Sequence, residues 1–343
     1  MTVCLVHGNP ETAAVWNRLA PLLDRGPVVR LSPPGFGAPV PPGFTATMEE
    51  YRRWLVTELE RFGQPVHLVG HDWGGAHVVS VAMTWPELLS SWVCDVIGLF
   101  DQDYRWHDRA QVWATPGAGE DAIAAMIDPP VTERAAALVK RGMHQDVALP
   151  VAEGQNAAMG ECILRLYRDA AQPAMAELGR NLERAGARPG LSIIATEDHL
   201  VGTDEQRRRA SARAGAAIAE LDGLGHWWFT QDPQRGAATI NGFWAGVGRE
   251  CYRASPFDAP GGNSVKMRGS DRIGPERPLE AEQVAKPVLP PDSLVDGQLS
   301  LYYHLDDFAN CYALLRHEEA VYLVYNGPGG PNLLSTFDKA PGT

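Results

Sequence analysis

The chain has 343 residues, 45% of them hydrophobic and 21% charged, which is typical of a soluble globular protein with a substantial core. Its formal net charge of −12 argues against a general affinity for nucleic acid or acidic membrane surfaces, because both require clustered Lys and Arg. Five scattered cysteines, none in a CxxC pair, indicate neither a disulfide framework nor a zinc site, so we expect a reducing, cytoplasmic location. The N-terminus has no basic segment before its short apolar run, and no run reaches membrane-spanning length; we expect no signal peptide and no membrane span.

Short apolar runs alternate with helical patterns from the start of the chain. The predicted strands of the first hundred residues are 2–6, 27–31, 66–69 and 91–97, and the predicted helices between them are 16–23 and 48–62. Such alternation predicts a parallel sheet with helices on both faces. Residues 100–185 read as a mainly helical insertion above the sheet, with helices at 133–141 and 162–168. The pattern then resumes with a strand at 191–195, a helix at 204–219, a strand at 220–224 and a helix at 233–247.

The composition changes after about Glu250, where residues 254–293 are crowded with Pro, Gly and charge in a way that is typical of a linker. Beyond it we predict a strand at 298–305, a helix at 306–319 and a strand at 320–325. The predicted domains are therefore a core of residues 1–99 and 186–249, an insertion at 100–185, a linker at 250–295 and a small C-terminal α/β module at 296–343. A partly ordered extension without chemistry is the alternative for the last of these.

The segment GHDWGG places Asp72 between Gly70 and Gly74, after an apolar run and before a helical pattern. In a nucleophile elbow, glycines two positions either side of the reactive residue make room for a strained turn that pushes its side chain into a cleft. The alternative is an ordinary strand-to-helix turn in which Asp72 caps the helix.

An Asp nucleophile needs a base that activates water, and His226 follows the last predicted strand; a packed aromatic loop is the alternative for HWW. The base needs a carboxylate that orients the imidazole, and Asp198 lies 28 residues earlier, after another predicted strand. Glu197 and Asp95 are alternatives to Asp198.

Developing charge must also be stabilised. HGNP follows the first predicted strand, so its backbone N–H groups and the Asn9 amide can face the same cleft, and Trp73 offers an indole N–H and a backbone N–H. All four motifs stand at carboxyl ends of predicted strands, where ligands bind in open α/β sheets. This concordance predicts a catalytic site. No HExxH-like ligand pair is present, so we predict neither a metal nor a cofactor.

Five segments, HGNPETAAVW, LSPPGFGAP, GHDWGG, ATEDHLVG and GLGHWW, resemble the Asp-nucleophile branch of the α/β-hydrolase superfamily, which contains haloalkane dehalogenases and epoxide hydrolases. The resemblance covers residues 1–248 and extends to the chain order of nucleophile, acid and histidine. It implies an α/β-hydrolase fold with residues 100–185 as a helical cap. It also implies that Asp72 attacks a carbon of a small apolar substrate to form an ester, which is hydrolysed by water that His226 activates and Asp198 helps to direct.

The two activities differ in how the leaving group is stabilised. Haloalkane dehalogenases cradle the halide with an Asn after HG and a Trp after the nucleophile, which Asn9 and Trp73 match. Epoxide hydrolases polarise the ring oxygen with cap tyrosines, and LYR resembles their WYR segment and gives Tyr167, while TPGAGE resembles another segment of their caps. The first cap tyrosine is not in its expected place, and Tyr104 stands somewhat upstream.

We therefore expect organohalide hydrolysis first, an epoxide hydrolase as the alternative, and a non-catalytic binding protein on the same fold as the alternative of another class. Tyr167, Tyr104 and Trp106 are the substrate-binding candidates, and packing of an apolar cap is the other interpretation of all three. Family members usually begin with two further strands before HG, so one sheet edge should be short. We hypothesise that segments 298–305 and 320–325 cover a surface of the core in a homodimer.

Overall fold

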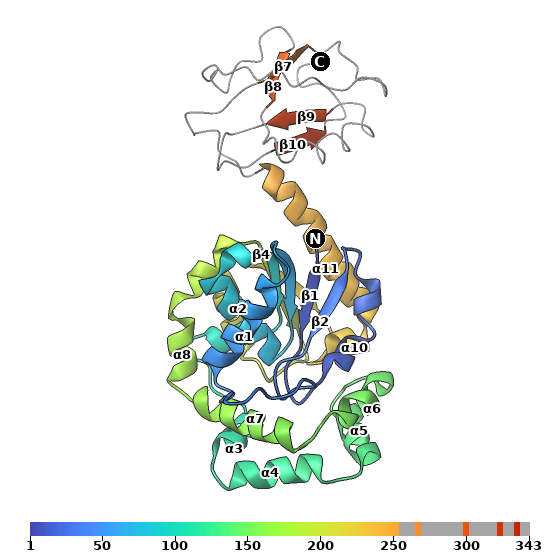
Figure 1. The fold of residues 1–343 in the computed structure, drawn as a ribbon, viewed down its shortest axis with the longest axis vertical. Coiled ribbons are helices and arrows are strands. Elements are labelled where there is room, and N and C mark those ends of the chain that lie inside the picture. Colours follow the sequence, from blue (N-terminus) through green and yellow to red (C-terminus); the bar gives the residue numbers. More distant parts are fainter. Residues whose placement is uncertain (254–264, 269–297, 302–320, 325–332, 337–343) are drawn as a thin grey trace. The chain divides into compact units, whose positions relative to one another are not determined.

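A computed structural model of the chain describes residues 1–253 and four short strands at 265–268, 298–301, 321–324 and 333–336 (Figure 1). The chain divides into two compact units, Met1–Trp244 and Ala245–Thr343. No helix in the described residues is both long and apolar enough to cross a membrane.

The first unit is built on a sheet of six parallel strands in the order β2-β1-β3-β4-β5-β6. The strands are β1 (Val3–Val6), β2 (Val28–Leu31), β3 (Val66–Gly70), β4 (Leu89–Cys94), β5 (Gly190–Ala195) and β6 (Ala217–Leu221). The chain runs from β1 outward to the edge strand β2 and then returns to β3 on the other side of β1. The carboxyl ends of β1 and β3 thus flank the point where the strand order reverses, which is where open α/β sheets bind ligands.

Successive side chains of the central strands point into two different apolar cores. In β1, Cys4 and Val6 belong to one core cluster, while Val3 and Leu5 belong to the other. Helices α1 (Met48–Glu60), α2 (Trp73–Thr84) and α9 (Asp204–Arg213) supply side chains to the first cluster, and α10 (Trp228–Gln231) and α11 (Pro233–Arg253) supply the second. A strand buried on both faces needs apolar residues at every position, which explains the uninterrupted run VCLV. The predicted parallel sheet with helices on both faces is confirmed.

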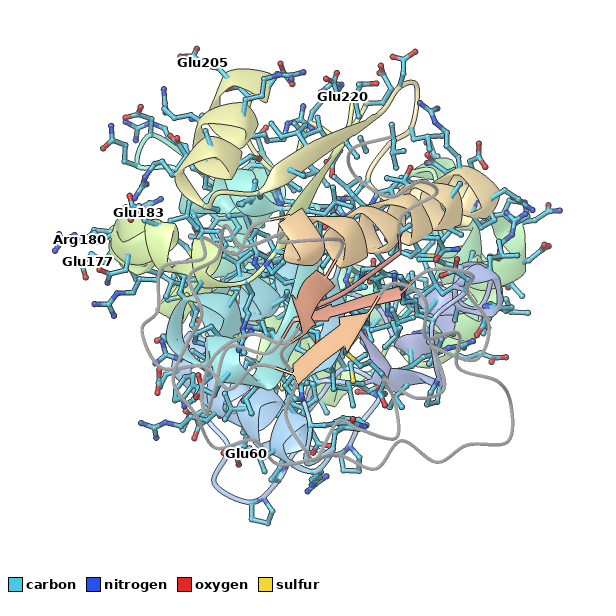
Figure 2. All side chains as sticks on the ribbon, turned by 90° about the horizontal axis from the view of Figure 1, so that it is seen from above. Glu60, Glu177, Arg180, Glu183, Glu205 and Glu220 are labelled. Atoms are coloured by element: carbon cyan, nitrogen blue, oxygen red, sulfur yellow. The ribbon has the colours of Figure 1, made fainter. Side chains whose placement is uncertain are left out.

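Charged side chains lie around the outside of this unit. Figure 2 shows several of them projecting from the periphery, namely Glu60, Glu177, Arg180, Glu183, Glu205 and Glu220. Their position is consistent with a negatively charged, well hydrated surface.

A helical cap separates β4 from β5. Its helices are α3 (Asp108–Ala114), α4 (Ala118–Ile127), α5 (Val131–Lys140), α6 (Gln145–Glu153), α7 (Ala157–Asp169) and α8 (Ala174–Leu178). In Figure 1, α3 to α7 lie together beyond one end of the sheet, opposite the N-terminus of β1. The cap therefore stands over the carboxyl ends of the strands.

Three predictions about this unit are wrong in detail. The strand predicted at 91–97 is Leu89–Cys94, and Ile97 begins a 3₁₀ turn that ends at Phe100. The helix predicted at 16–23 is replaced by two short 3₁₀ turns, Ala13–Trp16 and Ala20–Leu22, because Pro21 has no N–H to continue an α-helix. The helix predicted at 204–219 ends at Arg213, and the last strand is Ala217–Leu221 rather than 220–224. Gly215 turns the chain with a φ of +62°, and the Ala-rich segment after it pairs with β5 as an edge strand.

The second unit contains two antiparallel strand pairs. β7 (Val265–Arg268) pairs with β8 (Gln298–Leu301), and β9 (Val321–Val324) pairs with β10 (Leu333–Thr336). β8 and β9 lie within the strands predicted at 298–305 and 320–325. β7 lies within the range predicted as a linker, where VKMR alternates apolar and charged residues at the period of a strand. The helix predicted at 306–319 lies outside the described residues, and the covering of a core surface in a homodimer stays a prediction.

Candidate active site

Asp72 occupies a sharp turn between β3 and α2. Its backbone has φ +50° and ψ −130°, a conformation that is rare for any residue other than glycine. A Cβ at Gly74 would lie 2.2 Å from the carbonyl oxygen of Val6, and a Cβ at Gly70 would lie 2.6 Å from the carbonyl oxygen of Gly74. Only glycine fits at either position, so the turn has the crowding that was predicted for a nucleophile elbow.

The Asp72 side chain does not cap the helix that follows it. No hydrogen bond joins its carboxylate to the first turn of α2. Instead, Oδ1 accepts a hydrogen bond of 2.9 Å from the backbone N–H of Asn9, in the loop after β1. A Cβ at Gly8 would lie 2.1 Å from the same oxygen, so the HG sequence allows this loop to approach the carboxylate. The loop supplies a donor to one Asp72 oxygen and leaves the other, Oδ2, without a hydrogen bond in the described residues.

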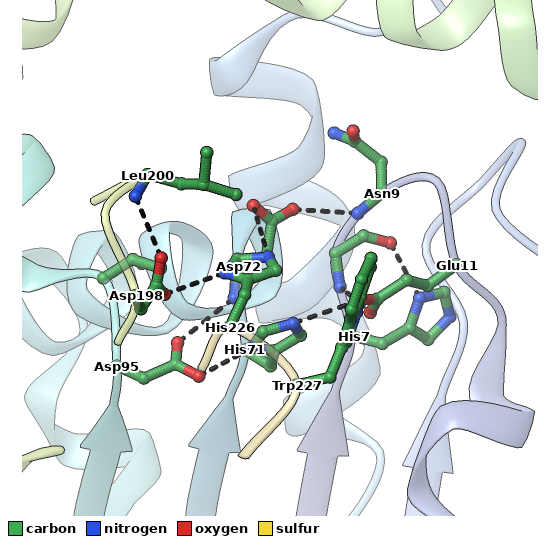
Figure 3. A network of polar contacts seen from close by, with 12 residues as sticks. His7, Asn9, Glu11, His71, Asp72, Asp95, Asp198, Leu200, His226 and Trp227 are labelled. Atoms are coloured by element: carbon green, nitrogen blue, oxygen red, sulfur yellow. Dashed lines mark hydrogen bonds and ion pairs between the residues drawn. The ribbon is translucent and has the colours of Figure 1, made fainter. Parts of the chain in front are cut away.

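His226 stands between two carboxylates (Figure 3). Its Nδ1 lies 2.8 Å from Asp198 Oδ2, and its Nε2 lies 3.8 Å from Asp72 Oδ2. Because an ionised carboxylate can only accept, Nδ1 carries a proton that it donates to Asp198, and Nε2 faces Asp72. The other oxygen of Asp198 accepts the backbone N–H of Leu200 at 2.9 Å.

The two alternatives to Asp198 lie elsewhere. Glu197 is exposed, and its carboxylate lies 3.9 Å from the ring of His199. Asp95 is buried but bonds to His71 instead of His226. Among the described residues, Asp198 is therefore the carboxylate that contacts the His226 ring through Nδ1.

Burial and charge act in opposite directions on these groups. Burial favours a neutral Asp198, yet the adjacent His226 outweighs it and lowers the pKa of Asp198. Burial also opposes a charge on His226, but Asp198 outweighs this effect and raises the pKa of His226. For Asp72, burial is the stronger influence and raises its pKa, although His226 and His71 favour the ionised form.

A second charged cluster lies beneath Asp72, and the sequence reasoning missed most of it. His71, which is fully buried, has Nδ1 2.6 Å from Asp95 Oδ2 and Nε2 3.1 Å from Glu11 Oε1. Trp228 also donates to Asp95, at 2.8 Å, and Trp227 donates to Glu11. The available signal was that His71 and Glu11 are titratable residues inside the GHD and HGNPE motifs.

The carboxylates of this cluster also hold the backbone around Asp72. Asp95 Oδ1 accepts the N–H of Asp72 at 3.2 Å, and Glu11 Oε2 accepts the N–H of Gly8 at 3.3 Å. The cluster therefore connects the turn at Asp72 to the loop after β1, in which the N–H of Asn9 donates to the Asp72 carboxylate.

The surroundings of His71 favour the positively charged form of its ring. Burial opposes the charge, but Asp95 and Glu11 outweigh it and hold the pKa of His71 well above its ordinary value. Burial likewise opposes ionisation of Glu11, but His71 lowers the pKa of that carboxyl to about 2. Ligand atoms of Glu11, His71 and His226 lie within 4.8 Å of one another, as in a metal site. A ring that donates from both nitrogens has no lone pair for a metal, so we interpret the group as a hydrogen-bond network.

The Asn9 side chain is buried beside Asp72 without a partner. Only 5% of the residue is exposed, and neither its amide nitrogen nor its amide oxygen makes a hydrogen bond in the described residues. Figure 3 shows the amide directed away from the strands, beyond the Asp72 carboxylate. A buried amide without partners is rare, and a water or a ligand is needed to satisfy its hydrogen bonds.

Aromatic residues of the cap close over Trp73. The ring of Trp106 stacks on Trp73 at 5.6 Å between centroids, and the ring of Tyr167 meets Trp73 edge-on at 5.6 Å. Burial, followed by the charge of Asp72, raises the pKa of Tyr167 well above its ordinary value, while the side chains of Trp73 and Asn9 offset part of the shift. Tyr167 thus lies with Asn9 and Trp73.

The other two cap candidates use their polar atoms within the protein. The Tyr104 hydroxyl donates to the Leu200 carbonyl at 2.9 Å, and the Trp106 indole donates to the Ala170 carbonyl at 3.1 Å. Both are near the aromatic cluster, but neither donor is directed at Asn9.

Glu11→Gln tests the buried cluster. One Glu11 oxygen accepts hydrogen bonds from His71 and Trp227, and the other accepts one from the Gly8 N–H. A Gln side chain would place its NH2 group, a donor, opposite one of these donors. It would also remove one of the two negative charges beside His71. We expect the free energy of unfolding in urea to fall by about 3 kcal/mol, the usual cost of breaking a buried ion pair. Glu49→Gln, in a partly exposed pair with Arg53, is the matched control and should cost under about 1 kcal/mol. Equal losses would contradict the role given to the cluster.

Curated relatives match only a short stretch of the chain. It is 39% identical over 83 residues to the "Probable oxidoreductase EphD" of Mycobacterium tuberculosis, which is 22% of this chain and 14% of that protein. It is 33% identical over 90 residues to the "Bifunctional epoxide hydrolase 2" of Mus musculus, which is 25% of this chain and 16% of that protein. The matched stretches are thus a small part of both relatives.

Solved structures match most of the first unit. The haloalkane dehalogenase DbeA from Bradyrhizobium elkani aligns with a TM-score of 0.56 and 19% identity, over 73% of this chain and 91% of that one. E-2-(Acetamidomethylene)succinate hydrolase aligns with a TM-score of 0.55 and 16% identity, over 71% of this chain and 91% of that one. At these identities the likeness shows the fold, and the predicted α/β-hydrolase fold is confirmed. Residues 5–239 also match the sequence family described as the Alpha/beta hydrolase family, and the chain belongs to that family.

Proposed function

We propose that this protein hydrolyses small apolar organic molecules at an electrophilic carbon through a covalent ester on Asp72, with organohalides as the first substrate class. The observation that carries the proposal is that His226 Nε2 lies 3.8 Å from an Asp72 oxygen while Nδ1 contacts Asp198. A carboxylate needs no base to attack carbon. A base oriented at that carboxylate by a second acid is needed to release an ester from it.

In the first half-reaction, Asp72 Oδ2 attacks the carbon that bears the halogen. The C–O bond forms as the carbon–halogen bond breaks, and the halide leaves with the electron pair. Oδ1 remains on the N–H of Asn9, so the carboxylate keeps its orientation while it loses its charge. The strained backbone at Asp72 supports this role because it holds the side chain out of the helix.

In the second half-reaction, water attacks Cγ of Asp72. His226 Nε2 takes one water proton, the charged imidazole is stabilised by Asp198, and the oxyanion that forms on the ester carbonyl is stabilised by the Asn9 N–H. The bond from Cγ to the alkyl oxygen then breaks, and the proton passes from His226 to the departing alcohol. The second water proton is released to solvent as Asp72 returns to its ionised form, and one oxygen of the water stays in the Asp72 carboxylate.

The unpartnered Asn9 amide and the Trp73 indole supply donors for a departing halide. A halide leaves as an anion, so it needs hydrogen-bond donors and no proton. The Asn9 amide N–H has no other partner in the described residues, and burial strengthens its interaction with a negative charge. These two residues also match the pattern expected of a halide site.

An epoxide is the second candidate substrate, and Tyr167 favours it. An opened epoxide oxygen stays attached to the product and needs a proton, which the Tyr167 hydroxyl can donate beside Asn9 and Trp73. The similarity to a bifunctional epoxide hydrolase points the same way. We rank it second because the raised pKa of Tyr167 makes it a weak acid, and because Tyr104, the other tyrosine, donates to Leu200.

Single turnover in ¹⁸O water tests the ester. We expect the peptide that contains Asp72 to gain one ¹⁸O label after turnover of a brominated alkane or an epoxide, and Asp72→Asn to abolish product formation. Bromide release measured against diol formation separates the two substrate classes. Asp232→Asn is a control at a partly buried aspartate outside the site, where Oδ1 accepts the Arg235 N–H, and it should leave the label on Asp72. Product without label in the Asp72 peptide rules out the ester mechanism.

The two half-reactions should differ in pH dependence. Burial opposes a charge on His226, but Asp198 outweighs this effect and stays beside the ring after Asp72 has become an ester. The base form is present only above the pKa that His226 has in the ester, so ester hydrolysis is lost as the pH falls through that pKa. Alkylation requires only ionised Asp72 and should persist to lower pH, because an Asp pKa raised from 3.8 starts well below that of a histidine. Rapid-quench measurements should therefore show the ester accumulating as the pH is lowered. Parallel loss of both steps would contradict the assignment of His226.

Variants of the leaving-group donors should distinguish the substrates. If halide is the natural leaving group, Asn9→Ala slows alkylation by bromoalkanes by about a hundredfold, the usual effect of losing a donor to a developing anion, while Tyr167→Phe has little effect. If an epoxide is the natural substrate, Tyr167→Phe is the variant that slows alkylation by the epoxide. Asn17→Ala, whose side chain contacts Arg30 in an exposed position, is the control for the first variant. Alkylation rates that are insensitive to both changes would remove these residues from the mechanism.

A further inference from the structure

In the loop that carries Asp198, both the backbone N–H and the backbone carbonyl of Leu200 make hydrogen bonds. The Leu200 N–H donates to Asp198 Oδ1 at 2.9 Å, and the Leu200 carbonyl accepts the Tyr104 hydroxyl at 2.9 Å. Tyr104 belongs to the segment between β4 and α3 at the start of the cap. A side chain from the cap therefore contacts the residue that holds the triad acid.

Asp198 depends on this contact because few other bonds orient its carboxylate. Oδ2 is used by His226 and Oδ1 by Leu200, and these are the two side-chain bonds of Asp198 in the described residues. Both bonds must persist if the carboxylate is to keep its plane. Leu200 lies in irregular structure between β5 and α9 and is 40% exposed, so side-chain packing alone does not fix it.

Tyr104 is itself firmly placed. Its ring is buried, its N–H donates to the Asp101 carbonyl at 3.0 Å, and its carbonyl accepts the Gln172 amide at 3.0 Å. The Asp101 carboxylate pairs with Arg209 of α9 at 2.7 and 2.8 Å. The hydroxyl thus extends from a support that is connected to both the core and the far end of the cap.

We propose that Tyr104 is a positioning residue that fixes the Asp198 loop through the Leu200 carbonyl and does not donate to the substrate. The proposal rests on the function proposed above. A hydroxyl that already donates to a carbonyl has no second proton for a substrate oxygen. Its effect should appear in the half-reaction that needs the aligned pair of Asp198 and His226, which is ester hydrolysis. Alkylation, which needs no base, should not depend on it.

Tyr104→Phe removes only the hydroxyl and keeps the packed ring. Tyr51→Phe is the matched control, because the buried Tyr51 hydroxyl also donates to a backbone carbonyl, that of Pro34, at 2.9 Å. In rapid-quench reactions with a bromoalkane and with an epoxide, we expect Tyr104→Phe to slow ester hydrolysis by about tenfold with both substrates, which corresponds to one hydrogen bond. Alkylation should stay unchanged, so the ester on Asp72 accumulates. If alkylation by the epoxide falls instead, Tyr104 is a substrate donor and the proposal is overturned; unchanged rates in both steps also overturn it.

A spectroscopic measurement tests the same contact without turnover. The Nδ1 proton of His226, shared with Asp198, gives a downfield ¹H resonance that is slow to exchange in protein labelled with ¹⁵N-histidine. We expect Tyr104→Phe to broaden this resonance by exchange with water, and Tyr51→Phe to preserve it. An unchanged resonance in Tyr104→Phe overturns the proposal. Absence of a wild-type ester refutes the proposed function alone, because the resonance still reports on the positioning of Asp198.

Discussion

The charge on His71, buried between the carboxylates of Glu11 and Asp95, is the interaction on which the site depends. An imidazolium in the interior is tolerated only because two anions flank it, and each anion uses its remaining oxygen for a backbone N–H, of Gly8 or of Asp72. The strained backbone at Asp72 is thus maintained by a charged hydrogen-bond network as well as by packing. The loop after β1 and the turn after β3 are fixed relative to one another before any substrate arrives.

The same network sets the electrostatics around the nucleophile. His71 favours the ionised form of Asp72 but opposes a charge on His226, whose ring centroid lies 4.5 Å away. Under the proposed mechanism, ester formation would remove the Asp72 charge that helps to hold a proton on His226. The pKa of the base should therefore be lower in the ester than in the free enzyme, at the step where the base form is required.

The sequence predicted the sheet, the elbow and the positions of Asp198 and His226 because each depends on a short local pattern at a strand end. It did not predict Glu11 and His71, because their function arises from contacts across β1, β3 and β4, and a lone buried histidine has no local signature. The error at 204–219 has a related cause: edge strand β6 is Ala-rich and partly exposed, so its pattern is closer to that of a helix than of a strand. The sequence also could not show that the Tyr104 hydroxyl donates to the Leu200 carbonyl, because that contact joins segments about a hundred residues apart.

The backbone N–H and carbonyl of Leu200 both make hydrogen bonds, and neither bond involves its side chain. Its N–H and carbonyl make the contacts that matter to Asp198 and Tyr104, and any residue except proline can supply them. The residue is 40% exposed, and its contacts with Asp198 and Tyr104 do not use its side chain. Under the proposed mechanism, the side chain at this position can therefore be exchanged without loss of the two backbone contacts that connect Tyr104 to Asp198.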